Sequence, residues 1–382
     1  DSGSTHFASM KKDQGFWPAT MYLEGLDQYR GWFQSSLLTA VGAFGEGAPF
    51  KECVTHGWTV DGEGRAMHKS LGNGVDPADI FNENGADILR LWAASADYHA
   101  DVRCSKAIFQ QLSQNYLKFR NTCKFMLDNL VDFDPAHLTR PEDMPTLDRW
   151  LITKLNELIE KVEQSYCDYE FHIITHAVND FCVTTLSSFY LDIVKDRLYC
   201  EGSDSAARRS AQTALYLTLS TLAKLFAPIL AFTCDEIWLA MPHTEVDDAR
   251  NVVLNEMNKP FTAYSLDAET MARWERIIEV RTAVNGALEE ARAAKVIGKS
   301  LEADVHLTVS EGDTFLADEN SEALADLFIV SKVELTVGGE LAVRVENAAG
   351  TKCPRCWKHS LTPNAEGLCP RCAKVVKHFD LI

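Results

Sequence analysis

A helical period through the middle of the sequence is the feature that most restricts what this chain can fold into. In residues 107–131 and 146–166, apolar side chains recur every three or four positions. They are Ile108, Leu112, Tyr116, Phe119, Cys123, Met126 and Leu130 in the first segment, and Leu147, Leu151, Leu155, Leu158, Val162 and Tyr166 in the second. Further helical patterns cover 172–199, 205–227 and 270–294. Thr146 is a candidate N-cap, and Pro228 should end or kink the fourth helix. We therefore predict a helical bundle over residues 106–300.

The first hundred residues have a different pattern, in which strands and helices mix. CVTHGWTV, residues 53–60, is rich in β-branched and aromatic residues and is typical of a strand. DPADIFNENGADILRLWAAS, residues 76–95, predicts a helix–turn–helix with Asp76 as N-cap and Pro77 in the first helical position. Strand, loop and helix in this order predict an α/β domain over residues 1–105.

A second α/β pattern follows the predicted bundle, over residues 301–348. Apolar residues alternate in 305–309, 333–337 and 341–345, which predicts three strands. The last two are expected to form a hairpin through Gly338 and Gly339. Residues 319–328, between the first and second strands, have a helical pattern.

Four cysteines near the end of the chain form two C-P-R-C knuckles. Cys353 and Cys356 are separated by twelve residues from Cys369 and Cys372. Two such knuckles supply four thiolates, which suits a structural Zn²⁺ with no open coordination position. Two disulfides or four free thiols are the alternatives. The other seven cysteines are scattered through apolar patterns, as in a reducing compartment, and this disfavours disulfides.

Charge is distributed unevenly along the sequence. The chain carries a net charge of −18, so it is not basic as a whole, and no apolar run is long enough to span a bilayer. Residues 351–382 nevertheless contain six cations, Lys352, Arg355, Lys358, Arg371, Lys374 and Lys377, against Glu366 and Asp380. This segment could dock a polyanion or be a solvated tail. Trp357 could stack on a nucleic-acid base or cover the metal site.

Several motifs together resemble one family. YLEGLDQYRGWFQSSL (22–37), THGWTVDGEGRAMHKSLGN (55–73), SSFYLDIVKDRLYC (187–200), IGKSLEA (297–303) and the terminal knuckles occur here in the order found in class I aminoacyl-tRNA synthetases, and most resemble the isoleucyl family. The resemblance covers essentially the whole chain. It implies the C-terminal part of a Rossmann-type catalytic domain (1–105), a helical anticodon-binding domain (106–300), a small α/β module (301–348) and a zinc-binding domain (349–382).

The resemblance implies an ATP-dependent ligase that joins isoleucine to AMP, with Mg²⁺, and then transfers the aminoacyl group to tRNA. Attack of a carboxylate on the α-phosphate needs positioning and neutralisation of phosphate charge rather than a strong base. By resemblance, Lys69 is the second lysine of the family's K-M-S-K-S loop, and Ser70 follows it as in the pattern. The sequence departs from the family at Ala66 and His68, where lysine and serine are usual. His68 could replace part of a phosphate contact.

The same resemblance assigns an adenylate site. Glu24, Asp27 and Gln28 match residues that hold the polar groups of the aminoacyl-adenylate, and His56 and Gly57 match the H-G pair beside the adenine. Taken alone, Glu24 could be an ordinary surface carboxylate and His56 a buried histidine with satisfied hydrogen bonds.

The sequence contains no H-x-G-H motif, although class I enzymes need an H-I-G-H motif for adenylate formation. The chain also begins at Asp1, inside a loop-like segment, so we expect a larger protein upstream and an inactive chain in isolation. A valyl or leucyl enzyme, a non-catalytic tRNA-binding protein and a zinc-ribbon DNA binder are the alternatives. The expected partners are isoleucine-specific tRNA, ATP and isoleucine. The expected state is a cytoplasmic monomer, not bound to a membrane.

Overall fold

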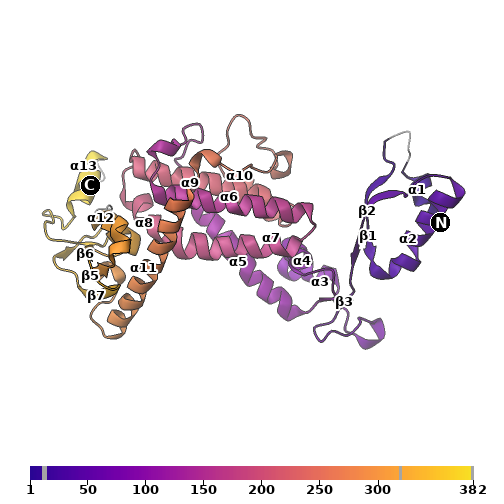
Figure 1. Cartoon of the computed structure of the whole chain (residues 1–382), viewed down its shortest axis with the longest axis horizontal. Helices are drawn as coiled ribbons and strands as arrows, with labels where there is room; N and C mark the ends of the chain where they lie inside the picture. Colours follow the sequence, from indigo (N-terminus) through magenta and orange to yellow (C-terminus); the bar gives the residue numbers. More distant parts are fainter. Residues whose placement is uncertain (11–14, 318–320, 380–382) are drawn as a thin grey trace. The chain divides into compact units, whose positions relative to one another are not determined.

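The computed structural model describes residues 1–10, 15–317 and 321–379, and it divides into two compact units. The first comprises residues 1–116 and 165–176, and the second 117–164 and 177–382. Each is described by itself below. The colours of Figure 1 follow the chain from indigo at the N-terminus to yellow at the C-terminus. Within the described residues, no helix is sufficiently long and apolar for a membrane span.

The first unit contains two small parallel sheets. Strand β1 (Ala19–Gly25) pairs with β2 (Phe50–His56), and β3 (Thr59–Val60) pairs with β4 (Val102–Arg103). Helix α2 (Trp32–Leu38) packs on β1, where the Tyr22 ring stacks on Trp32 with centroids 4.2 Å apart. The remaining helices are α1 (Thr5–Ala8), α3 (Pro77–Asn84) and α4 (Ala86–Ser95).

The strand predicted over 53–60 is wrong as a single element, because the ladder stops at His56 and resumes at Thr59. The break falls at Gly57, where the chain changes its pairing partner from β1 to β4. A Cβ on this residue would lie 2.4 Å from the carbonyl oxygen of Ala100, so only glycine fits this close approach. The predicted helix–turn–helix is confirmed. The Asp76 side chain accepts from the amide of Ala78, and Gly85 (φ 86°) separates α3 from α4.

The predicted helices of the second segment are present. They are α5 (Lys106–Asp128, which begins in the first unit), α6 (Thr146–Cys167), α7 (Phe171–Asp180), a π-helical stretch (Phe181–Tyr190), α8 (Leu191–Cys200), α9 (Ala206–Phe226) and α11 (Ala268–Ala293). Helix α9 ends before Pro228, as expected. Helix α10 (Ala231–Ala240) was not predicted.

Helix α9 lies at the centre of the bundle. Its residues are buried without interruption from Ser210 to Ala223, which explains why this stretch contains no charged residue. The fully buried carboxylate of Asp148, on α6, accepts hydrogen bonds from Tyr190, Ser210 and Arg197. One buried charge thus joins α6, the π-helical stretch, α8 and α9.

A three-stranded sheet follows the bundle (Figure 1). Strand β5 (Ala303–Val309) is central and pairs in parallel with β6 (Lys332–Val337) and antiparallel with β7 (Ala342–Asn347). Helix α12 (Ser321–Phe328) matches the described part of the helix predicted over 319–328. Residues 319 and 320 lie outside the described part.

The predicted hairpin between the last two strands is wrong. β6 and β7 lie on opposite sides of β5, and the amides of Gly338 and Gly339 donate to the Val309 carbonyl at its end. The connection spans two strand spacings, about 10 Å, which four residues can reach. β5 takes the centre because its alternate residues Ala303, Val305, Leu307 and Val309 are fully buried. Alternation identified the strands, but it did not specify their neighbours.

Candidate functional site

The predicted adenylate-binding residues gather at the ends of two parallel strands. Glu24 pairs in register with Thr55, and Gly25 with His56, so both strands end at one edge of the sheet. The carboxyl ends of parallel strands are where α/β folds place their ligands. A Cβ on Gly25 would lie 2.7 Å from an oxygen of Asp27 and 3.6 Å from His56 Cε1. The structure therefore brings Glu24, Asp27 and His56 to one place.

Local hydrogen bonds orient the polar atoms of Gln28 and His56 in this group. Gln28 Oε1 accepts from the Trp32 amide at 3.0 Å, and its Nε2 donates to Asp27 Oδ2 at 3.1 Å. His56 Nδ1 lies 2.8 Å from the carbonyl oxygen of Gly57, and the Gly57 amide donates to the carbonyl oxygen of Tyr98. His56 is half-buried, whereas Glu24 and Asp27 are exposed. The carboxylates are thus open to a ligand.

The glycine-flanked loop of residues 61–73 lies between β3 and α3. The backbone of Lys69 begins a 3-10 turn, Lys69–Leu71, and the Lys69 side chain lies outside the part that the structure describes. His68 and Ser70 are exposed. Several hydrogen bonds within residues 61–73 shape this loop, and Arg103 donates to the carbonyl oxygen of Gly62 from outside it.

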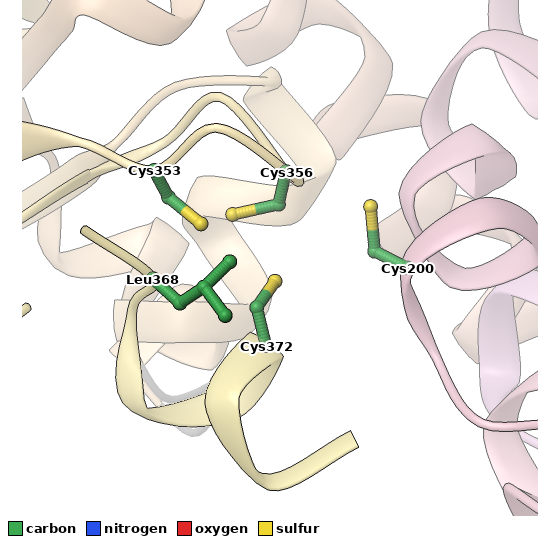
Figure 2. Close-up of a cluster of buried hydrophobic side chains, with 5 residues drawn as sticks. All are labelled: Cys200, Cys353, Cys356, Leu368 and Cys372. Atoms are coloured by element: carbon green, nitrogen blue, oxygen red, sulfur yellow. The ribbon is translucent and has the colours of Figure 1, made fainter. Parts of the chain in front are cut away.

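The four knuckle cysteines converge as predicted. Figure 2 shows three of them, Cys353, Cys356 and Cys372, with their sulfurs directed toward one another. Their sulfurs all lie within 4.8 Å of one another, and Cys356 Sγ is 3.7 Å from Cys369 Sγ. Four sulfurs held tetrahedrally at Zn–S distances of about 2.3 Å would be about 3.8 Å apart. None of the eleven cysteines is paired in a disulfide, so the disulfide alternative does not describe this structure.

Hydrogen bonds to sulfur favour the ionised form of Cys356, whereas burial raises the pKa of Cys369 and the hydrogen bond with Cys356 raises that of Cys372. The Cys369 amide donates to Cys353 Sγ at 3.4 Å, and the Cys372 amide to Cys369 Sγ at 3.5 Å. A hydrogen bond from Cys372 is the main cause that lowers the pKa of Cys356 to about 5. The knuckles are placed by the hairpin of β8 (Thr351–Lys352) and β9 (His359–Ser360) and by the start of α13 (Pro370–His378).

The cysteine module, residues 349–382, is docked on the end of α8. Cys200 is buried together with the knuckle cysteines, and burial raises the pKa of its thiol to about 12. Arg355 donates to the carbonyl oxygen of Cys200 and lies 3.7 Å from Cys372 Sγ. Arg371 makes two hydrogen bonds to Asp196.

This docking changes the interpretation of the basic tail. Lys358 pairs with Asp326 and Lys352 with Glu302, so Arg355, Arg371 and these two lysines all have partners within the chain. Lys374 and Lys377 are exposed. Trp357 is 54% exposed, with Lys299 Nζ 5.5 Å from its ring centroid. The surface available to a polyanion is therefore smaller than the composition predicted.

Two known families match the chain. Residues 1–105 match the class I tRNA synthetases (I, L, M and V), and residues 148–307 match the anticodon-binding domain of tRNA ligases. The isoleucine--tRNA ligase of Moorella thermoacetica is 47% identical over 99% of this chain and 43% of its own length. That of Syntrophotalea carbinolica is 47% identical over 98% of this chain and 42% of its own length.

The chain belongs to the class I aminoacyl-tRNA synthetases. This synthetase chain spans less than half the length of the curated relatives it matches. A ternary complex of LeuRS from Agrobacterium radiobacter K84 with tRNA and LeuAMS has a TM-score of 0.51 and 18% identity, over 78% of this chain and 32% of the LeuRS chain. A Mycobacterium tuberculosis methionyl-tRNA synthetase bound to methionyl-adenylate has a TM-score of 0.52 and 19% identity, over 61% and 46%. At these identities the two structures support the fold.

Sequence reasoning missed three features of this synthetase. The first is the bonding of Asp61 and Asn73 across the loop, although each precedes a glycine and D-G and N-G pairs are turn signals. The second is Cys200, which the sequence grouped with the scattered cysteines. The third is the pairing of the basic tail with α8. No sequence signal could have found it, because the partners are about 170 residues apart.

Proposed function

We propose that this chain is part of an isoleucine--tRNA ligase, which activates isoleucine with ATP and Mg²⁺ and transfers it to isoleucine-specific tRNA. The observation that carries the proposal is the 47% identity to isoleucine--tRNA ligases over nearly all of the chain. The valyl, leucyl and non-catalytic alternatives have no comparable support. We propose the cytoplasm as its location and a monomer as its state.

The strand-end group supplies the polar contacts of the adenylate in this proposal. Glu24 has an exposed carboxylate that can accept from an ammonium or a ribose hydroxyl. Asp27 and Gln28 hold the remaining polar groups, while His56 and Gly57 lie beside the adenine. These residues bind the adenylate and do not act as nucleophiles or bases, because the carboxylate of the amino acid is itself the nucleophile.

The loop of residues 61–73 supplies the phosphate contacts. Lys69 neutralises charge that develops on the phosphates, and Ser70 and His68 add donors. Adenylate formation also requires the H-I-G-H histidines, which this sequence does not contain. The four domains proposed are the catalytic part (1–105), the anticodon-binding bundle (106–300), the α/β module (301–348) and the zinc domain (349–382).

The four thiolates of the cysteine module suit a structural zinc ion. Cys353, Cys356, Cys369 and Cys372 would hold it, and the sulfur spacing and amide donors fit a closed tetrahedral site. The ion would fix the two knuckles against each other and supply no open position. Metal analysis under reducing conditions should give about one zinc per chain, and less than about half would contradict the site.

Binding of the chain to tRNA transcripts tests the function. Isoleucine-specific tRNA should bind about tenfold more tightly than valine- or leucine-specific tRNA at the same salt concentration. A preference for either of the other two would assign the chain to that enzyme. Equal affinity for all three would leave a general tRNA-binding protein. An unrelated stem-loop RNA of equal length controls for charge.

A further inference from the structure

One carboxylate at the base of the loop of residues 61–73 accepts four hydrogen bonds. Asp61 Oδ1 accepts from the amides of Glu63 (3.0 Å) and Arg65 (2.9 Å). Its Oδ2 accepts from Arg65 Nε and from Asn73 Nδ2, both at 2.9 Å. Asp61 is only 6% exposed, although the loop around it is largely open to solvent. The bond from Asn73 is the main cause that holds the pKa of Asp61 well below its usual range.

Asn73 closes the loop from its other end. Its Nδ2 donates both to Asp61 and to the carbonyl oxygen of Ala66 (3.1 Å), and its Oδ1 accepts from the amide of His68 (2.9 Å). Both donors of one carboxamide and its acceptor are thus used within the loop. Residues 66–68 are fixed from the far end of the loop, and the next residue is Lys69.

We propose that Asp61 and Asn73 are positioning residues, which set the backbone from which Lys69 reaches the phosphates of ATP. This inference rests on the proposed function of Lys69. Gly72 (φ 61°) and Gly74 flank Asn73. Because glycine restricts the backbone dihedral angles least, this stretch has little conformational preference of its own. Without the Asn73 bonds, the three-residue turn Lys69–Leu71 would keep one internal bond, from the Leu71 amide to the His68 carbonyl oxygen.

Asparagine is the residue type that this arrangement requires. The side chain at position 73 must donate to a carboxylate and a carbonyl and also accept from an amide, which aspartate or alanine cannot do. Asn73→Asp would set two carboxylates together, and Asn73→Ala would remove all three bonds. Asp61→Asn would keep an acceptor for the amides of Glu63 and Arg65 but would present a donor to Asn73.

Tryptic cleavage after Lys69 measures the order of the loop in the full chain. We expect Asn73→Ala and Asp61→Asn each to accelerate it by about tenfold or more, because each loses two or three hydrogen bonds. Hydrogen exchange of the loop amides should also be faster in these two variants. Asn82→Ala, at an exposed asparagine of α3, is the matched control and should leave both rates unchanged. If Asn73→Ala cleaves like Asn82→Ala, the proposal is wrong.

The reciprocal double variant separates positioning from general loss of structure. In Asp61→Asn/Asn73→Asp, residue 61 can donate to residue 73, which can still accept from the His68 amide. Cleavage should be slower than in either single variant, but faster than in the unsubstituted chain, because the bond to the Ala66 carbonyl oxygen is not restored. Additive effects of the two substitutions would show that no direct bond couples them, and would overturn the proposal.

Protection by ATP with Mg²⁺ links the loop to its ligand. In the unsubstituted chain, ATP should slow cleavage after Lys69, and Asn73→Ala should need about tenfold more ATP for the same protection. If ATP protects neither protein while Asn73→Ala still frees the loop, the proposed ATP-binding role fails and the role of Asp61 and Asn73 in loop order stands. If ATP protects both proteins at the same concentration, the positioning role fails.

Discussion

At the scale of single residues, the structure explains how the loop tolerates Ala66 and His68. The carbonyl oxygen of Ala66 accepts from Asn73, and Ala66 forms a β-bridge with Val60. His68 is held through its backbone amide, and its side chain is exposed. Because the backbone makes these contacts, they do not depend on which side chains stand at positions 66 and 68.

The first prediction concerns the relative importance of Lys69 and His68. In an active synthetase that carries this chain, Lys69→Ala should slow isoleucine-dependent pyrophosphate exchange by about 10²-fold or more, because it removes a cation from the transition state. His68→Ala should slow exchange by less than about tenfold, because it removes one hydrogen-bond donor and leaves the lysine in place. Comparable losses for both variants would contradict this order.

Trp357 is the residue for which the sequence left two roles open. Its φ of 66° is unusual for a bulky residue, and its ring is more than half exposed beside Lys299. A side chain held outward in this conformation can offer a stacking face.

The second prediction uses a substitution that suits the backbone. Trp357→Gly should weaken tRNA binding by about tenfold, because base stacking on an aromatic ring contributes about 1–3 kcal/mol. Metal content and stability should not fall, since glycine adopts a positive φ without strain. Filter binding and metal analysis measure the two effects. Unchanged tRNA affinity together with lost metal would assign Trp357 to covering the metal site.

At the scale of whole elements, the sequence predicted whether a segment is a helix or a strand. It predicted less well which other elements that segment pairs with. The periods of α5, α6, α9 and α11 and the alternation of β5 were sufficient, because burial of one face imposes them. Helix α10 was not predicted. Strands β6 and β7 were predicted to pair with each other as a hairpin, whereas β5 lies between them. Strand order depends on which strand is paired along both of its edges, and alternation within a strand does not specify this.

The third prediction tests the docking of the cysteine module on α8. Burial alone would raise the pKa of Asp196, but the bonds from Arg371 outweigh it and lower the pKa. The two side chains are 23% and 20% exposed. Arg371→Met should therefore lower the free energy of local unfolding of α13 by about 2–3 kcal/mol, measured by hydrogen exchange.

The exposed pair Arg344–Glu346, also an arginine with a carboxylate, provides a control. Arg344→Met should change the exchange of α13 amides little, since exposed pairs contribute about 0–1 kcal/mol. A double-mutant cycle of Arg371→Met with Asp196→Asn should show a coupling above about 1 kcal/mol. Independent effects in that cycle would mean that the ion pair does not hold the module.

At the scale of the molecule, charge is the property that the structure revises most. The net charge of −18 opposes tRNA binding by the chain as a whole, so cations must be concentrated where RNA docks. The sequence contains six such cations in the tail, but three of them form ion pairs with carboxylates of the chain, and Arg355 donates to the carbonyl oxygen of Cys200. Composition could predict a basic segment, whereas only the fold shows which charges face solvent.

The last prediction follows from the two exposed lysines, Lys374 and Lys377. Each phosphate contact contributes about 0.7–0.9 to the slope of log K against log salt, so replacing both lysines by glutamine should reduce the slope by about 1.5. Six free cations would instead predict a change of about 5 on deleting residues 350–382. Lys332→Gln, whose charge is neutralised by Glu334, is the matched control and should leave the slope unchanged. An unchanged slope in the double variant would limit the cysteine module to a structural role.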